Sequence, residues 1–101
     1  MCGEDEPVML ISEENLKTRN AILGFEKRIN DMHLGFEKYH AGVENVMPNW
    51  EDIERELLRF SRRKILDLEL SQHLDRLMYK LQNRKKIWLK WVEEAHHRPE
   101  R

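Results

Sequence analysis

The sequence contains few of the residues that interrupt or crosslink a chain. It has one cysteine, three prolines and four glycines among 101 residues. The single cysteine, Cys2, excludes an internal disulfide framework. Pro7, Pro48 and Pro99 stand near the start, the middle and the end. Two long stretches therefore lack the residue that breaks a helix most strongly, and an all-α protein is indicated.

Long hydrophobic runs are also lacking. No stretch approaches the roughly 18 apolar residues of a membrane-spanning helix, so we expect no membrane partner. The acidic start of the chain, Glu4 to Glu6, differs from the basic and then apolar layout of a secretion signal. The expected location is therefore cytoplasmic. A chain of 101 residues corresponds to one domain at most.

The common signatures of catalysis are missing as well. The sequence shows no glycine-rich phosphate loop and no Ser/His/Asp arrangement. We therefore expect no catalytic activity, and the sequence does not identify a cofactor.

Charge is abundant and unevenly distributed. Charged residues make up 37% of the chain and hydrophobic residues 40%, a balance typical of globular or coiled-coil proteins. Residues 1–58 carry a net charge of −7, and residues 59–101 carry +6. This asymmetry is expected either for a protein that binds nucleic acid or for a hairpin with one acidic and one basic arm.

Apolar residues in the first half follow a helical seam spaced three and four residues apart. This spacing is that of a coiled-coil seam and does not suit a strand. Ser12 is a suitable N-cap, and Pro48 ends the element, so the pattern predicts a helix over 13–46 after an irregular lead at 1–11. The seam residues are Ile22, Phe25, Ile29, Met32, Phe36, Tyr39, Val43 and Val46.

A second, thinner apolar line runs along the same predicted helix. Leu16, Leu23, Leu34 and Ala41 lie nearly opposite the seam at ~100° per residue. A helix with two apolar lines usually has neighbours on two sides. This pattern favours a bundle of three or more helices or an oligomer.

The second half predicts a long helix over 50–96, after a turn at 47–49 and before a tail at 98–101. Asn49 can cap this helix, and acidic residues crowd its first turn. Its apolar face rotates by roughly 140° near residues 61–64. Either the helix breaks near 61–66 or it changes partners there, and the absence of glycine and proline favours a continuous helix. One face holds Trp50, Ile53, Leu57, Phe60 and Leu68, and the other holds Leu66, Leu70, Leu74, Leu77, Leu81, Trp88, Val92 and Ala95.

The predicted fold is a long antiparallel helical hairpin within one domain at 12–97, or three helices if the second one breaks. A lone hairpin leaves apolar surface uncovered, so we expect a homodimer that forms a four-helix or larger bundle. The residues expected at the interface are Ile22, Phe25, Ile29, Met32, Phe36, Tyr39, Val43 and Trp88.

Histidine and glutamate side chains suggest a metal site as an alternative function. His33, Glu37, His40 and Glu44 form one stripe of the first predicted helix, and Glu37 and His40 have the E-x-x-H spacing of di-iron bundles. Glu69 and His73 could add ligands from the second helix. Imidazole and carboxylate together suit zinc, iron or manganese. The predicted ligands are His33, Glu37, His40, Glu69 and His73.

Basic residues suggest nucleic-acid binding as a further alternative. Arg59, Arg62, Arg63 and Lys64 form one cluster, and residues 79–91 interleave basic and aromatic side chains. Such residues neutralise phosphates, and Trp91 could stack on a base. The sequence pI near 6.5 does not favour this function. The preferred prediction is therefore a helical protein–protein interaction or oligomerisation module.

Overall fold

The computed structural model is all-helical. It describes the backbone of residues 2–97 and the side chains of residues 13–97. The described chain contains three helices and no strand: α1 (Cys2–His40), α2 (Trp50–Ser61) and α3 (Leu68–His96). Within this part, no helix is long and apolar enough to cross a membrane. The expected fold class is confirmed, and of the two predicted arrangements the one with three helices is correct.

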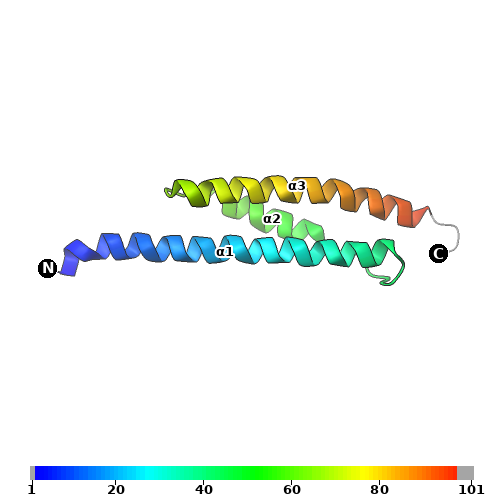
Figure 1. The fold of residues 1–101 in the computed structure, drawn as a ribbon, viewed down its shortest axis with the longest axis horizontal. Coiled ribbons are helices and arrows are strands. Elements are labelled where there is room, and N and C mark those ends of the chain that lie inside the picture. Colours follow the sequence, from blue (N-terminus) through cyan, green and yellow to red (C-terminus); the bar gives the residue numbers. More distant parts are fainter. Residues whose placement is uncertain (1, 98–101) are drawn as a thin grey trace.

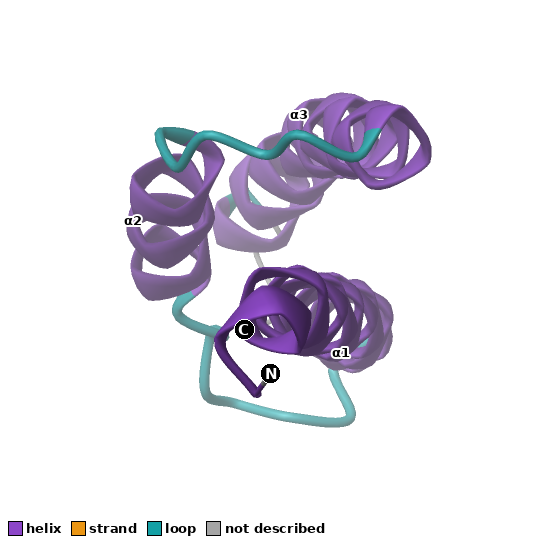
Figure 2. Cartoon of the chain, turned by 90° about the vertical axis from the view of Figure 1, so that its left-hand side faces the viewer, coloured by secondary structure: helices purple, strands orange, loops and turns teal. Residues whose placement is uncertain are grey.

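The two long helices lie side by side and run in the same direction. The chain leaves α1 at the end opposite its N-terminus, returns through α2 and then runs back along α1 as α3 (Figure 1). Seen along the helices, α2 packs on one side of the α1–α3 pair (Figure 2). The predicted antiparallel hairpin of two long helices is therefore wrong, because the short α2 reverses the chain a second time.

All three helices contribute to one core. Phe36 of α1 and Trp88 of α3 are fully buried and stack with ring centroids 4.9 Å apart. Phe25 and Phe60 join α1 to α2 at 5.5 Å. The remaining buried core residues are apolar: Ile22, Ile29, Ile53, Leu57, Leu70, Leu74, Leu77 and Leu81.

Helix α1 ends six residues earlier than predicted. Gly42 has a φ of 83°, a left-handed conformation that glycine adopts without strain. The Val43 N–H donates to the Lys38 carbonyl at 2.9 Å, and the Gly42 N–H donates to Tyr39 at 3.2 Å. This pair of bonds is the Schellman motif, which satisfies the last carbonyls of a helix. Beyond it, Val43 and Val46 leave the seam and are exposed.

Helix α1 also begins earlier than predicted, since residues 2–11 are helical and are not an irregular lead. Ser12 is a suitable cap, but a capping residue does not oblige a helix to begin. No glycine or proline occurs between Pro7 and Gly24, so the sequence offers nothing to interrupt the helix there.

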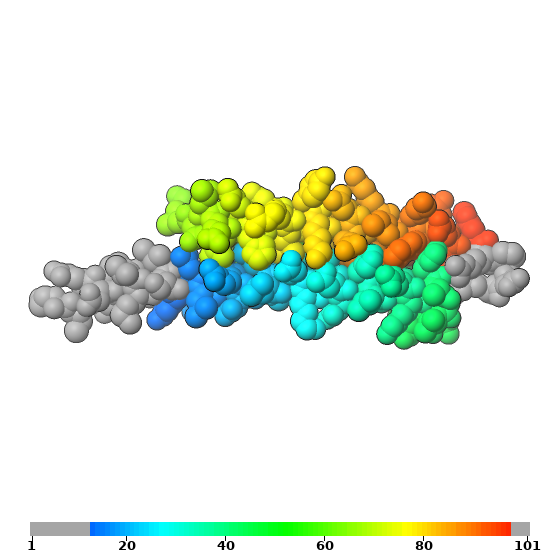
Figure 3. All heavy atoms as spheres, viewed as in Figure 1, coloured from blue at the N-terminus to red at the C-terminus, as the bar shows by residue number. Residues whose placement is uncertain are grey.

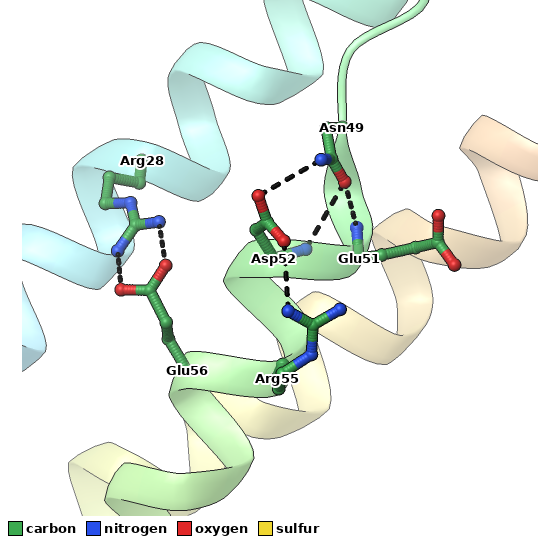
Figure 4. A network of polar contacts seen from close by, with 6 residues as sticks. All are labelled: Arg28, Asn49, Glu51, Asp52, Arg55 and Glu56. Atoms are coloured by element: carbon green, nitrogen blue, oxygen red, sulfur yellow. Dashed lines mark hydrogen bonds and ion pairs between the residues drawn. The ribbon is translucent and has the colours of Figure 1, made fainter.

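The start of α2 confirms the predicted cap. The Asn49 side-chain oxygen accepts from the backbone N–H groups of Glu51 and Asp52, at 3.1 and 3.4 Å (Figure 4). One turn later, Glu56 accepts two bonds from the Arg28 guanidinium, at 3.0 and 2.9 Å. These bonds, together with the charge of Arg28, lower the pKa of the Glu56 carboxyl. The pair fastens α2 to α1.

The predicted helix 50–96 breaks at residues 62–67, without a glycine or a proline. Asp67 begins α3 by accepting from the Leu70 N–H at 2.9 Å. The break lets the two differently oriented apolar faces point into the same core. Because they lie in or beside this turn, Leu66 and Leu68 are exposed rather than packed with either face.

Candidate functional site

The predicted metal stripe lies where α1 and α3 meet. The His33 Nδ1 atom accepts a hydrogen bond from the Trp88 Nε1–H at 3.0 Å. Its Nε2 atom lies 3.5 Å from a carboxylate oxygen of Glu37. Because the indole N–H can only donate, Nδ1 carries the lone pair and Nε2 carries the proton. The imidazole is therefore neutral, with its Nδ1 lone pair engaged.

The surroundings of His33 oppose its protonation. Burial lowers the pKa of the imidazole, and the nearby charge of Arg84 lowers it further. Glu37 acts in the opposite direction, and Lys80 adds a smaller lowering effect. The pKa of His33 thus lies below that of a free histidine, which keeps the lone pair available to Trp88.

The other histidine of the stripe belongs to a different set of contacts. The His40 Nε2 atom lies 2.8 Å from a carboxylate oxygen of Glu94, and its ring stacks on Trp91 at 5.4 Å. One residue before His40, the Tyr39 hydroxyl lies 3.2 Å from His96 Nε2. These contacts tie the C-terminal ends of α1 and α3 together.

The structure does not unite the predicted metal ligands. Glu69 and His73 line a hollow of about 340 Å³ with Arg19, Leu23, Leu70 and Arg76, near the other end of α3 from Trp88. Glu44 lies past the end of α1. Among residues 13–97, no three His, Cys, Asp or Glu side chains are grouped so that they could hold a metal ion.

The residues predicted for a dimer interface belong to the core of a single chain. Ile22, Ile29 and Phe36 are fully buried by α2 and α3, and Phe25 and Met32 are packed against the same core. Tyr39 and Trp88 are buried, whereas Val43 is 71% exposed. The seam is thus covered by α2 and α3 within one chain.

The basic residues divide into paired and unpaired groups. Lys85 pairs with Glu54 of α2 at 3.0 Å and lies over the Trp50 ring at 4.5 Å. Lys80 approaches Glu26 at 4.0 Å. The cluster Arg59, Arg62, Arg63 and Lys64 forms no salt bridge to any described residue. Trp91, which could stack on a base in the nucleic-acid alternative, stacks on His40.

The second apolar line of α1 remains uncovered. Leu16, Leu23 and Leu34 are 59%, 47% and 55% exposed. Viewed from the side opposite α2, α1 and α3 lie next to each other along the molecule (Figure 3). We call the line and its flanks the outer face of α1, which comprises Leu16, Arg19, Leu23, Lys27, Asp31, Leu34 and Glu37, together with Ala41 directly past the end of the helix.

The outer face is a regular row of apolar side chains that the described residues leave in contact with solvent. The pattern that revealed it was visible in the sequence, but the seam was stronger and was assigned to the dimer interface. No family model, no curated protein and no solved structure matches the chain.

Proposed function

We propose that the chain is a helical interaction module that assembles with a second copy of itself and has no catalytic activity of its own. The observation that carries this proposal is the row of three exposed leucines on the outer face of α1. Isolated exposed leucines are common on protein surfaces, but a regular row on one helix is typical of a helix-packing surface.

The size of the outer face is compatible with this role. From Leu16 to Leu34 it spans 18 residues, or about 27 Å of helix. Burying one leucine side chain contributes about 1.5–3 kcal/mol. In a two-fold symmetric contact, each leucine position contributes twice, because both copies bury the same residues. Because the outer face lies on a helix that already packs along α3, little backbone conformational entropy is lost on association.

Sedimentation velocity over a range of concentrations tests the proposal. We expect a reversible dimer in the wild-type protein. The double variant Leu23→Asn, Leu34→Asn should sediment as a monomer. Because both leucines are half exposed, this variant should keep the helical circular-dichroism spectrum of the wild type.

Leu89 on α3 provides a matched control. It is 45% exposed, close to the 47% of Leu23, but it lies outside the outer face. Leu89→Asn should leave the dimer unchanged. A monomeric wild-type protein at tens of micromolar would refute the proposed function.

The unpaired basic cluster supports nucleic-acid binding as a second candidate function. Arg59, Arg62, Arg63 and Lys64 lie at the end of α2 and in the turn that follows it, and none of them forms a salt bridge with a described carboxylate. Such cations exchange their counterions for phosphates when they bind nucleic acid.

Binding to a random DNA duplex at several salt concentrations tests this candidate. Contacts to phosphates should give an affinity that falls steeply with salt, and the variant Arg62→Ala, Arg63→Ala should reduce that slope. Absence of binding at low salt would exclude it.

A further inference from the structure

The outer face of α1 is nearly symmetric about its own midpoint. If the helix is reflected through the point between Arg28 and Ile29, Leu23 falls on Leu34, and Leu16 falls on Ala41. These four residues lie within ~20° of one another around the helix. An antiparallel copy of α1 would therefore place apolar residues opposite apolar residues at every level of the line.

The charges beside the line have the same symmetry with opposite sign. Arg19 and Glu37 lie on the flank next to α3, where Arg19 lines the hollow with Leu70 and Glu37 approaches His33. The reflection brings Arg19 to within one residue of Glu37, about 1.5 Å along the axis. Lys27 and Asp31 lie on the other flank. The same reflection brings Lys27 to within one residue of Asp31.

We propose that two copies pair through the outer face of α1 in an antiparallel, two-fold arrangement, with Leu23 of each copy packed on Leu34 of the other. This inference rests on the proposed function. A two-fold axis brings the same flank of both helices together. Arg19 of each copy then pairs with Glu37 of the second copy, and Lys27 pairs with Asp31.

The contacts within one chain leave these groups available. Arg19 forms no salt bridge with a described residue. The Glu37 side chain is 53% exposed. Lys27 and Asp31 pair with each other at 2.7 Å, with side chains 77% and 60% exposed. In the dimer, the two Lys27–Asp31 pairs form a square of alternating charges.

A parallel arrangement lacks these advantages. In a parallel, in-register pair, each residue of the line faces its own copy, and the two-fold axis brings opposite flanks together. Arg19 of one copy and Glu37 of the second copy then lie 18 residues, or about 27 Å, apart along the axis and cannot pair. The antiparallel register brings them to nearly the same level.

Charge reversal tests the register in the full-length dimer. Arg19→Glu and Glu37→Arg should each weaken dimerisation about 10-fold, because each turns two attractive pairs into repulsive ones. The double variant Arg19→Glu, Glu37→Arg should restore the wild-type dissociation constant. If the double variant lost as much free energy of dimerisation as the two single variants together, the Arg19–Glu37 pairing would be wrong.

Disulfide trapping provides an independent test. In a Cys2→Ser background, copies that carry Leu23→Cys are mixed with copies that carry Leu34→Cys and oxidised. The antiparallel register predicts disulfides only between unlike copies, because like positions lie 11 residues, or about 16 Å, apart along the axis. Disulfides between like copies would overturn the register while leaving the proposed dimer intact. A wild-type protein that is monomeric would overturn both.

Discussion

The contact between Trp88 and His33 shows how a single histidine can serve packing rather than chemistry. Trp88 is fully buried, and a buried indole N–H requires an acceptor. His33 Nδ1 supplies that acceptor, which accounts for a histidine at the border of an apolar seam. The same lone pair is what a metal ion would need, so the packing role competes directly with the predicted role as a ligand.

The His33 contact makes stability depend on pH. The pKa of His33 is lowered in the folded chain, so the unfolded chain, with an ordinary value of about 6.5, binds the proton more readily. The stabilisation is present above pH 6.5 and is lost as the pH falls through the folded pKa. Urea unfolding between pH 7.5 and 5 should show this loss.

The variant His33→Gln provides the control for the pH dependence. Its amide oxygen can still accept from Trp88 but does not titrate in this range. The variant should therefore lose less stability than the wild type on acidification. An equal loss in both proteins would show that His33 is not the responsible group.

At the scale of the element, local hydrogen bonds at the helix ends determine the architecture. Asp67 begins α3, so the second predicted helix becomes two, and Gly42 ends α1 six residues earlier than predicted. Neither helix end needs a proline beside it. The Asp67 carboxylate accepts a hydrogen bond from a backbone N–H that has no partner within the helix, and the left-handed Gly42 lets the last carbonyls of α1 find donors.

Removing the Asp67 cap should destabilise the protein. Asp67→Ala loses the bond to the Leu70 N–H, and the loss of an N-cap costs about 1 kcal/mol. Chemical denaturation should show this change. Asp75→Ala, an exposed position within α3, should lie within about 0.5 kcal/mol of the wild type. Equal effects at both positions would contradict the capping role.

Replacing Gly42, in the turn after α1, and Gly24, within α1, by alanine should change the stability of the protein in opposite directions. Gly42→Ala forces a side chain into a left-handed backbone and should cost about 1 kcal/mol or more. Gly24 lies in the middle of α1, and a Cβ there would meet nothing within 4 Å. Gly24→Ala should therefore stabilise the protein by up to about 1 kcal/mol. Thermal unfolding of both variants measures the difference.

The sequence predicted the helices and the buried face of α1, but it did not predict which elements cover that face or where the second helix breaks. Apolar periodicity identified the face of α1 that is buried from Ile22 to Tyr39, because a helical period reports which side must leave water. It could not say which element covers that side. The seam was therefore assigned to a second copy, although α2 and α3 of the same chain cover it. The break at 62–67 was undervalued because Asp67 was not recognised as a cap.

For the candidate site, apolar spacing identified the line of leucines, but the seam was the stronger pattern and was assigned to the dimer interface. Leu16, Leu23 and Leu34 were recognised as a second apolar face, and the structure leaves them exposed. Their relation to Arg19 and Glu37 could not be weighed until the seam was known to be covered. The choice between the two faces depends on tertiary packing, which local spacing does not contain.

At the scale of the whole molecule, the parallel α1–α3 pair separates the buried seam of α1 from the exposed outer face. The seam of α1 faces α2 and α3, and the outer face lies on the other side of the same helix. If the proposed function holds, folding and association use different residues. A change on one side should alter the stability of the chain, and a change on the other should alter only its assembly.

Phe36 and Val43 test this separation, since both belong to the seam predicted from the sequence. Phe36 is fully buried and stacks on Trp88, so Phe36→Ala should lower the free energy of unfolding by about 3–5 kcal/mol. Val43 lies beyond the end of α1 and is 71% exposed, so Val43→Ala should change it by less than about 0.5 kcal/mol. Because Phe36 supports the fold of one chain, its effect should persist in the monomeric Leu23→Asn, Leu34→Asn background. If Phe36→Ala were harmless in that background, the seam would belong to the contact between copies after all.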